Sequence, residues 1–255
     1  MRTIERLAEW GWLLVAVPLA IVASATGAAF ERALLALALA AILGGAASAR
    51  HRHTLARAAV VMLGAATLAL MLHLAGDDFG YRYAWLYSAP ELPLHLKIAT
   101  LWGGEEGTLL LLATLLALAA CRLVDRDGWS GAGALLLSGA FTVGALIWDP
   151  FAATPSADLD AAPRGMNAHL LSPWMALHPP LLFAAYVLVL APFGGAMQAL
   201  ARGQGEWARR HRTWLRSAWL VLSSGLFAGM WWAYEDFSFG QFWHWDPVQT
   251  SVFVV

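Results

Sequence analysis

Seven apolar stretches, each long enough to cross a lipid bilayer as a helix, follow one another along this sequence. A hydrocarbon core about 30 Å thick is spanned by about 20 helical residues. With 60% hydrophobic and only 13% charged residues, against about 25% charged in soluble domains, a water-soluble globule is excluded. The sequence predicts an all-α fold, a polytopic transmembrane helical bundle. The stretches are Gly11–Ala29, Ala33–Ala49, Ala58–Ala75, about Ile98–Cys121, Gly131–Trp148, Pro179–Leu200 and Trp214–Tyr234.

The first and last apolar stretches differ from the others. The first resembles a secretory signal with a small-residue end at Ser24–Ala28, but we expect a retained helix, because Pro18 is tolerated in membrane helices. An eighth stretch begins at Val248 and is too short at Val255 to cross a membrane. We therefore expect a truncated eighth span and a chain that is part of something longer.

Basic residues are distributed unequally between alternate loops. With the N-terminus inside, the inner set holds twelve of the 16 basic residues, whereas twelve of the 17 acidic residues lie in the outer set. Basic loops stay cytoplasmic, so the long loops Gly76–Lys97 and Asp149–His178 are predicted to lie outside. The inner basic residues are Arg2, Arg6, Arg50, Arg52, Arg57, Arg122, Arg126, Arg202, Arg209, Arg210, Arg212 and Arg216, and the outer ones are Arg32, Arg82, Lys97 and Arg164.

Several functional classes are excluded by composition. A net charge of −1 gives no broad basic face for nucleic acid. The single cysteine, Cys121, excludes an internal disulfide, a CxxC redox motif and a multi-cysteine zinc site. A Ser/His/Asp triad, a phosphate-binding loop and an HExxH zinc motif are not found in the sequence.

The segment from Trp231 to Val248 carries the densest signal in the sequence. Nine aromatic side chains fall within fifteen residues, more than an interfacial belt needs for one helix. Flat rings of low rotamer entropy suit a planar apolar ligand of porphyrin size, and Asp246-Pro247 is a helix-start signal. The alternative is an interfacial aromatic girdle. The rings are Trp231, Trp232, Tyr234, Phe237, Phe239, Phe242, Trp243, His244 and Trp245.

A second signal is the segment Ser172–Pro180, which precedes an apolar stretch. Pro179 is favourable in the first turn of a helix, so we predict that His178 is held at an outward helix start. Neutral imidazole is a good ligand for haem iron. The alternative is a capping or interface histidine; the shared depth and side of His178 and the aromatic segment favour the ligand. The other histidines that compete for this role are His73, His95, His169 and His244.

The third signal is Trp102-Gly-Gly-Glu-Glu-Gly-Thr108. Only fourteen apolar residues, Thr108–Cys121, follow it, about 21 Å of helix, so the span includes polar residues. Ionised groups facing lipid are costly, hence Glu105 and Glu106 must face an outer cavity or the interface. Alternatively, they are carboxylates that complement a helix N-terminus.

Together these segments resemble the N-terminal half of the CcmF-type cytochrome c haem lyases, in the wider haem-handling family that includes CcmC and CcsA. The resemblance runs from about Asp77 to the end, roughly two thirds of the chain. The matching motifs are Leu92-Pro, Trp102-Gly-Gly-Glu-Glu-Gly-Thr, Asp149-Pro-Phe, Asn167-Ala-His-Leu-Leu-Ser-Pro, His178-Pro-Pro-Leu-Leu-Phe, Trp231-Trp-Ala-Tyr-Glu and Trp243-His-Trp-Asp-Pro-Val.

The resemblance implies a periplasmic Trp-rich platform, the WWD domain, that holds haem. His178 corresponds to the family's first outward axial histidine and is the expected ligand of the haem iron. The family's remaining ligand histidines lie after the WWD segment, so we expect at most half of the ligand set here. The expected haem-binding residues are His178, Trp231, Trp232, Trp243, Trp245, Asp246, His244, Trp102 and Glu106.

The sequence departs from the family pattern within the platform. Where the family has Trp, Phe and Glu, this chain has Phe242, His244 and Gln249. Stacking survives the change from Trp to Phe, whereas the missing acid puts a polar role at Gln249 in doubt. His244 is an alternative ligand, although we assign it to the platform first.

The activity implied is cytochrome c biogenesis by thioether formation between haem and apocytochrome c in the bacterial inner membrane. We expect the chain to divide into N-terminal membrane helices (1–75) and a haem-handling core (76–255). We expect the chain to be inactive by itself. The implied partners are a haem-delivering chaperone, apocytochrome c with its thiol-handling subunits, and lipid. Two alternatives stay open: a haem transporter or holding subunit without catalysis, and a small-substrate secondary transporter that uses Glu105 and Glu106.

Overall fold

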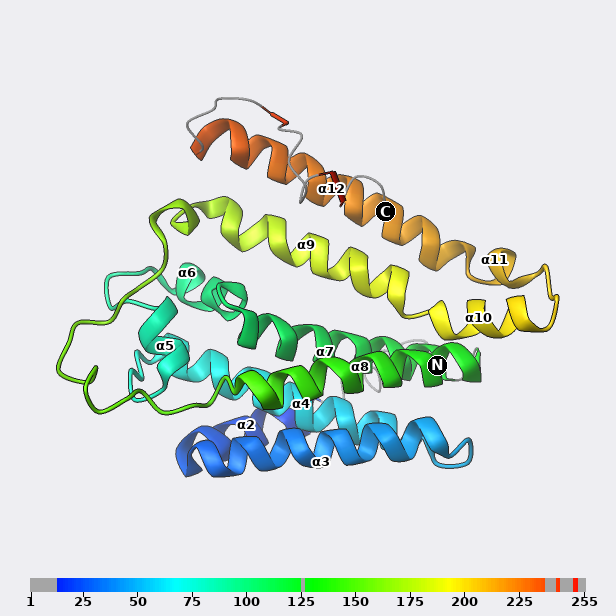
Figure 1. Cartoon of the computed structure of the whole chain (residues 1–255), viewed down its shortest axis with the longest axis horizontal. Coiled ribbons are helices and arrows are strands. Elements are labelled where there is room, and N and C mark those ends of the chain that lie inside the picture. Colours follow the sequence, from blue (N-terminus) through cyan, green and yellow to red (C-terminus); the bar gives the residue numbers. More distant parts are fainter. Residues whose placement is uncertain (1–12, 125–126, 237–241, 244–249, 252–255) are drawn as a thin grey trace.

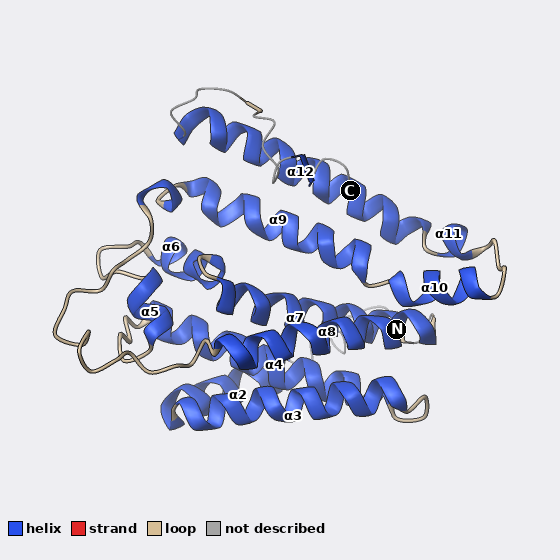
Figure 2. Cartoon of the chain, in the orientation of Figure 1, coloured by secondary structure: helices blue, strands red, loops and turns tan. Residues whose placement is uncertain are grey.

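The computed structural model describes residues 13–124, 127–236, 242–243 and 250–251. Within these ranges the regular secondary structure is helical, and the only β-type pairing is an isolated bridge between Tyr81 and Ala153. Figure 2 shows this helical composition directly. The predicted all-α class is confirmed. The elements are α2 (Leu13–Thr26), α3 (Ala28–Ala47), α4 (Arg52–Ala75), α5 (Arg82–Tyr87), α6 (Leu94–Ala99), the 3-10 helix η1 (Thr100–Trp102), α7 (Glu105–Leu123), α8 (Gly128–Trp148), the 3-10 helix η2 (Ala168–Leu170), α9 (Pro173–Leu190), α10 (Phe193–Ala201), α11 (Trp207–Arg210) and α12 (Arg212–Asp236).

Five segments of the described chain are long and apolar enough to cross a membrane: α3, α4, α7, α8, and α9 together with α10. A helix lies in each of the seven predicted stretches, but the predicted count of seven to eight spans is not confirmed. The described part of the first stretch, α2, has only 14 residues. The last, α12, is rich in Trp, Ser and Gly, which lowers its mean hydropathy. The eighth stretch falls largely outside the described residues.

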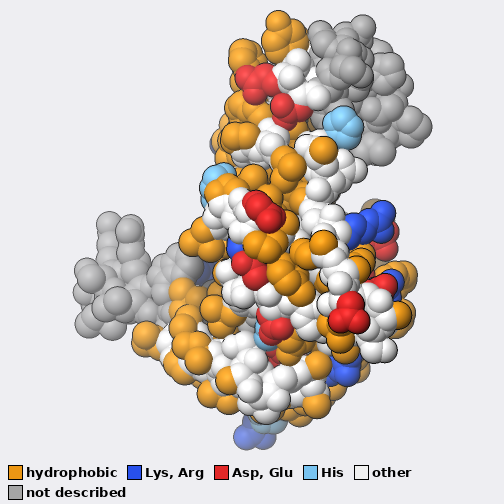
Figure 3. Space-filling model, turned by 90° about the vertical axis from the view of Figure 1, so that its left-hand side faces the viewer, with side chains coloured by type: hydrophobic (Ala, Val, Ile, Leu, Met, Phe, Trp, Pro, Cys, Tyr) orange, Lys and Arg blue, Asp and Glu red, His pale blue; other side chains and the backbone are white. Residues whose placement is uncertain are grey.

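The loops divide between the two ends of the bundle, as Figure 1 shows. One end, called here the acidic end, holds loops 76–93 and 149–172, the start of α9 and the end of α12. The opposite, basic end holds the connections 48–51 and 202–211, the end of α7 and the start of α8. Figure 3 looks onto the acidic end, where acidic side chains lie among hydrophobic ones. The predicted separation of alternate loops is therefore confirmed, whereas the side of the membrane that each end faces stays a prediction.

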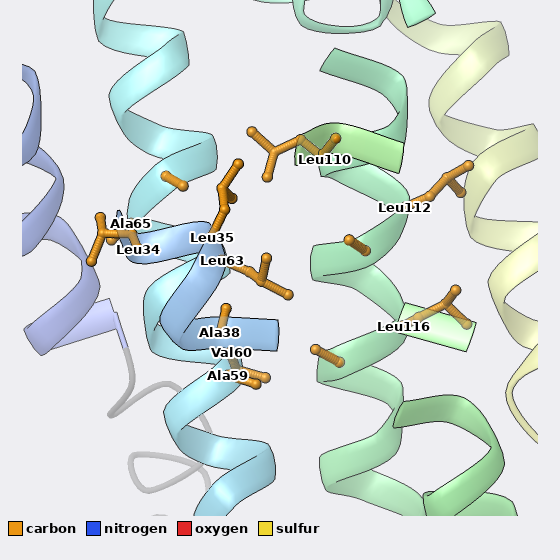
Figure 4. Close-up of a cluster of buried hydrophobic side chains, with 14 of the residues drawn as sticks. Leu34, Leu35, Ala38, Ala59, Val60, Leu63, Ala65, Leu110, Leu112 and Leu116 are labelled. Carbon is orange, nitrogen blue, oxygen red and sulfur yellow. The ribbon is translucent and has the colours of Figure 1, made fainter. Parts of the chain in front are cut away.

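The core lies between α3, α4, α7 and α8. Figure 4 shows leucine and alanine side chains of α3, α4 and α7 at the contact between these helices. Because lipid offers no hydrophobic drive for helix association, close packing of small residues and interhelical hydrogen bonds hold such bundles together. Bonds of this kind join α7 to its neighbours: Thr67 Oγ1 and Thr114 Oγ1 are 2.8 Å apart, and Ser138 Oγ donates to the Ala113 carbonyl at 2.7 Å.

Helices α9 and α12 form a pair on one side of this core. They pack against each other along their lengths, and α9 also contacts the core helix α7 and the short helix α6. In Figure 1, α12 is the outermost helix of the pair. Its side chains Trp219 and Phe227 are each 67% exposed, as suits a face toward lipid. This pair brings the His178 segment and the Trp231 segment together.

Candidate functional site

Helix α9 begins earlier than the sequence predicts. Its first residue is Pro173, and the Ser172 side chain caps it by accepting a hydrogen bond from the Trp174 N–H. His178 consequently lies in the second turn, and Pro179 lies inside the helix. The prediction that His178 marks the helix start is wrong, because Ser172-Pro173 is the stronger start signal, a capping hydroxyl followed by proline at the first position.

An internal proline leaves one helical carbonyl without its donor. The N–H that Pro179 lacks would have bonded to the carbonyl of Met175, four residues earlier. That carbonyl accepts instead from the indole Nε1–H of Trp102, at 2.8 Å. The proline thus creates the acceptor to which η1 is attached, and this places Trp102 against α9.

The imidazole of His178 is held between α9 and α12. Its Nδ1 lies 2.8 Å from the carbonyl oxygen of Gly225, which can only accept, so Nδ1 carries the proton and Nε2 of the neutral ring has a free lone pair. The ring packs on Gly229, where an added Cβ would come within 2.5 Å of it. Nε2 has no hydrogen-bond partner within the described ranges. The arrangement therefore favours the tautomer in which Nε2 can act as a metal ligand.

Trp232 and Trp102, both predicted as site residues, are brought to the same place. Trp232 meets the His178 ring edge to face, with centroids 5.8 Å apart. It is buried with Met175 in a small cluster against which Trp102 packs. We call His178, Trp232, Met175 and Trp102 the His178 cluster. Three elements far apart in sequence, namely η1, α9 and α12, meet in it.

A second group of rings lies next to this cluster at the acidic end and is more exposed. Phe242 stacks on Tyr234, with ring centroids 4.5 Å apart and planes within 6°, and Trp231 contacts both rings. The carboxylate of Glu235 accepts from the indole N–H of Trp231 and from that of Trp174, each at 2.6 Å. We call these five residues the outer aromatic cluster.

The remaining platform residues are described only in part. Trp243 is partly buried. His244, Trp245 and Asp246, together with the predicted helix start at Asp246-Pro247, lie outside the described residues. Their assignment to the platform stays a prediction.

Glu105 and Glu106 form the first turn of α7 and line an open pocket of about 620 Å³ with Tyr87, Trp102 and Trp148. The two alternatives offered by the sequence are therefore both correct about where these residues lie: they face a cavity, and they occupy a helix N-terminus. Burial raises the pKa of Tyr87, and the negative charges of Glu106 and Glu105 raise it further. Trp102 belongs both to this pocket and to the His178 cluster.

The glycines of the Trp102–Thr108 segment allow a close approach of Tyr83. A Cβ on Gly107 would lie 2.4 Å from the Tyr83 hydroxyl. That hydroxyl lies 2.9 Å from the carbonyl oxygens of Thr100 and Leu101, which share its single proton, and it accepts from the Gly104 N–H at 3.1 Å. Tyr83 therefore holds the turn that presents Trp102.

His73, one of the competing histidines, is already engaged on both ring nitrogens. Its Nε2 lies 2.7 Å from the carboxylate of Glu31, which is completely buried, and its Nδ1 lies 3.0 Å from that of Asp78. Tyr81 stacks on the ring. With no nitrogen lone pair left, His73 is removed as a candidate for haem iron.

Three residues of this region were missed by sequence reasoning: Trp174, Glu235 and Met175. Trp174 lies four residues before His178, and Glu235 lies four residues after Trp231, so each pair shares a helix face. That spacing was a usable signal for both. Met175 contributes a backbone carbonyl, which no side-chain pattern identifies.

Comparison with known proteins shows the family to which the chain belongs. The family model for cytochrome C assembly protein matches residues 102–255. Among similar curated proteins, the cytochrome c-type biogenesis protein NrfE of Haemophilus influenzae is 35% identical over 191 residues, covering 71% of this chain and 30% of that protein. CcmF of the same organism is 32% identical over 73% of this chain and 30% of its own length. CcmF of Escherichia coli is 31% identical over 73% and 30%, respectively.

The chain thus spans about 30% of the length of these relatives. No solved structure matches it.

Proposed function

The chain belongs to the cytochrome C assembly protein family, and on this basis we propose that it holds haem at its acidic end during cytochrome c biogenesis. The observation that supports this most is the state of His178. Its Nδ1–H is committed to the Gly225 carbonyl, which leaves Nε2 as a neutral nitrogen donor of the kind that binds haem iron. The ring is fixed beside Trp232 rather than free to rotate.

The residues present suit haem in three respects. His178 supplies the iron ligand. Trp231, Trp232 and Phe242 supply flat apolar rings, to which the sequence adds Trp243 and Trp245. Of the four cations of the outer set, Arg32 is paired with Asp149 and Lys97 with Asp77. We therefore assign the haem propionates to the remaining two, Arg82 and Arg164, which are exposed and lie near Tyr87.

Haem would supply the vinyl groups to which the two cysteine thiols of an apocytochrome add, giving thioethers. The protein's own contribution is to bind, orient and shield. Gly225 and Gly229 orient His178, and the outer aromatic cluster excludes water from one face of the site. Glu106 and Trp102 line the adjoining pocket and are assigned here to the surroundings of the haem.

This chain covers about 30% of the length of its relatives, so the step we propose for it is the holding of haem, with residues 76–255 as the core and 1–75 as supporting membrane helices. The proposed partners are a haem-delivering chaperone, apocytochrome c and its thiol-handling subunits. The proposed location is the bacterial inner membrane, with the acidic end in the periplasm.

The test is a hemin titration of the detergent-purified chain, followed by visible absorption. The wild type should give a haem band with a low-spin component from the imidazole, and His178→Ala should lose that component. His95→Ala, which changes an exposed histidine at the same end, is the matched control. A spectrum unaltered by His178→Ala would show that His178 joins helices and does not bind iron.

A further inference from the structure

Glu235 occupies an unusual position for an acidic residue on α12. It lies in the last turn, where the helix dipole disfavours a negative charge, next to a second acid, Asp236. The two differ in what they contact. Glu235 accepts two indole N–H bonds at 2.6 Å, whereas no hydrogen bond or ion pair of Asp236 is found within the described residues. The Glu235 carboxylate therefore has a role that charge alone does not explain.

One of the two bonds of Glu235 lies within α12, and the other crosses to α9. One runs to Trp231, one turn earlier on α12, and the other to Trp174 on the first turn of α9. Hydrogen bonds to an ionised carboxylate are about twice as strong as neutral ones. Each bond fixes one edge of an indole and so sets the direction of its ring plane.

These two indoles lie close to the His178 cluster, since Trp174 packs against the buried group that holds Met175 and Trp232. Trp174 is four residues before His178 and lies on the same face of α9, while Trp231 is adjacent to Trp232, which contacts the His178 ring. Trp231 also packs against Phe242 and Tyr234. A single carboxylate thus ties the outer turn of α9 to the end of α12, one helical turn from His178.

We propose that Glu235 is a positioning residue of the haem site and that Trp174, which it orients, is a further ring of the platform. This rests on the proposed function. Glu235 does not touch the iron ligand; it acts through the orientation of Trp174 and Trp231. Removing one bond of the pair should leave His178 in place but loosen the rings beside it.

The experiment compares Glu235→Gln with Asp236→Asn in the full chain by hemin titration. The glutamine keeps the size and one acceptor oxygen but loses the charge and the second acceptor. We expect hemin affinity to fall about tenfold in Glu235→Gln, with a shifted absorption band, and to be unchanged in Asp236→Asn. Equal effects of the two variants would overturn the proposal, because both remove the same charge from the same helix end.

A second comparison separates positioning from a general structural role. In a Trp174→Phe, Trp231→Phe background there is no indole N–H left to hold, so Glu235→Gln should have no further effect on hemin affinity. Each single Phe variant should reproduce part of the Glu235→Gln effect. A full additional loss in the double-Phe background would overturn the proposal.

A readout without haem tests the geometry itself. Ultraviolet resonance Raman bands that report indole N–H bonding should weaken in Glu235→Gln and stay unchanged in Asp236→Asn. If the wild type takes up no hemin, the proposed function fails, and the Raman difference still tests the Glu235 contacts. If hemin binds but the Raman bands do not differ, only the Glu235 proposal fails.

Discussion

The indole N–H of Trp102 donates to the carbonyl of Met175, the same carbonyl that Pro179 deprives of its helical partner. A residue that weakens α9 is thus the reason that η1 is attached to it. The His-Pro-Pro motif and the Trp-Gly-Gly motif, which are separate signals in the sequence, form one structural unit. His178 lies immediately before the proline that makes this contact possible.

Trp102→Phe should destabilise the fold, because the Met175 carbonyl is then left without a donor. A buried acceptor without a partner costs about 1–3 kcal/mol, measured as the free energy of unfolding in mixed micelles. In a Pro179→Ala background the restored backbone N–H donates to the Met175 carbonyl. Trp102→Phe should then lower the free energy of unfolding clearly less. Trp148→Phe, at an indole in the same pocket but 52% exposed, is the control. Equal costs with and without Pro179 would refute this explanation.

Gly229→Ala should displace the His178 ring. The new Cβ would lie 2.5 Å from it, and overpacking of this kind costs about 1–3 kcal/mol, although Ala is intrinsically the better helix former by about 1 kcal/mol. We expect weaker hemin binding and a lower free energy of unfolding. Gly205→Ala, where a Cβ meets nothing within 4 Å, should change neither. Normal hemin binding by Gly229→Ala would mean that the position of the His178 ring against Gly229 is unimportant for haem binding.

His73→Ala should be costly to stability but not to haem ligation. It leaves the fully buried Glu31 without the imidazole 2.7 Å away, which we expect to cost about 3 kcal/mol. Asp78→Ala removes a partner whose side chain is 47% exposed and should cost less than about 1 kcal/mol. A Glu31→Leu, His73→Leu pair should recover most of the loss. Loss of the haem band in folded His73→Ala protein would contradict the assignment of both nitrogens.

Alkaline pH should expose the role of Tyr83. Burial raises the pKa of its phenol well above the ordinary value of 10.0. The folded state therefore keeps a proton that the unfolded state releases above that pH. Stability is then unaffected below the unfolded pKa and falls as pH rises beyond it. Tyr83→Phe should be less stable near neutrality and show a shallower alkaline decline. Parallel pH curves for the two proteins would show that Tyr83 ionises equally in both states.

Much of the fold follows from local sequence rules. The apolar stretches predict helices because backbone groups in lipid must be bonded within the segment, and the structure places a helix in each. The start of α9 at Ser172-Pro173 was not predicted, although a capping hydroxyl followed by proline is itself a local start signal. The indole N–H of Trp102 supplies the donor that the Met175 carbonyl loses to Pro179, and that donor comes from another element.

The candidate site was predicted by residue type and only in part by position. His178, Trp102 and Trp232 lie together in the structure, and the long loops lie together at one end of the bundle, whereas the binding of haem by these residues stays a prediction. The contacts made by the Met175 carbonyl, Glu235 and Trp174 were not predicted, since they join elements 61 to 73 residues apart along the chain.

The sequence alone determined that this chain is a helical membrane protein with its aromatic and histidine signals at one end, because helix formation and loop charge depend on neighbours along the chain. The tertiary structure decided which nitrogen of His178 is occupied and which indoles Glu235 holds. Those facts depend on how α9 and α12 pack, and a hydrogen bond between two helices is set by their relative position rather than by either sequence segment.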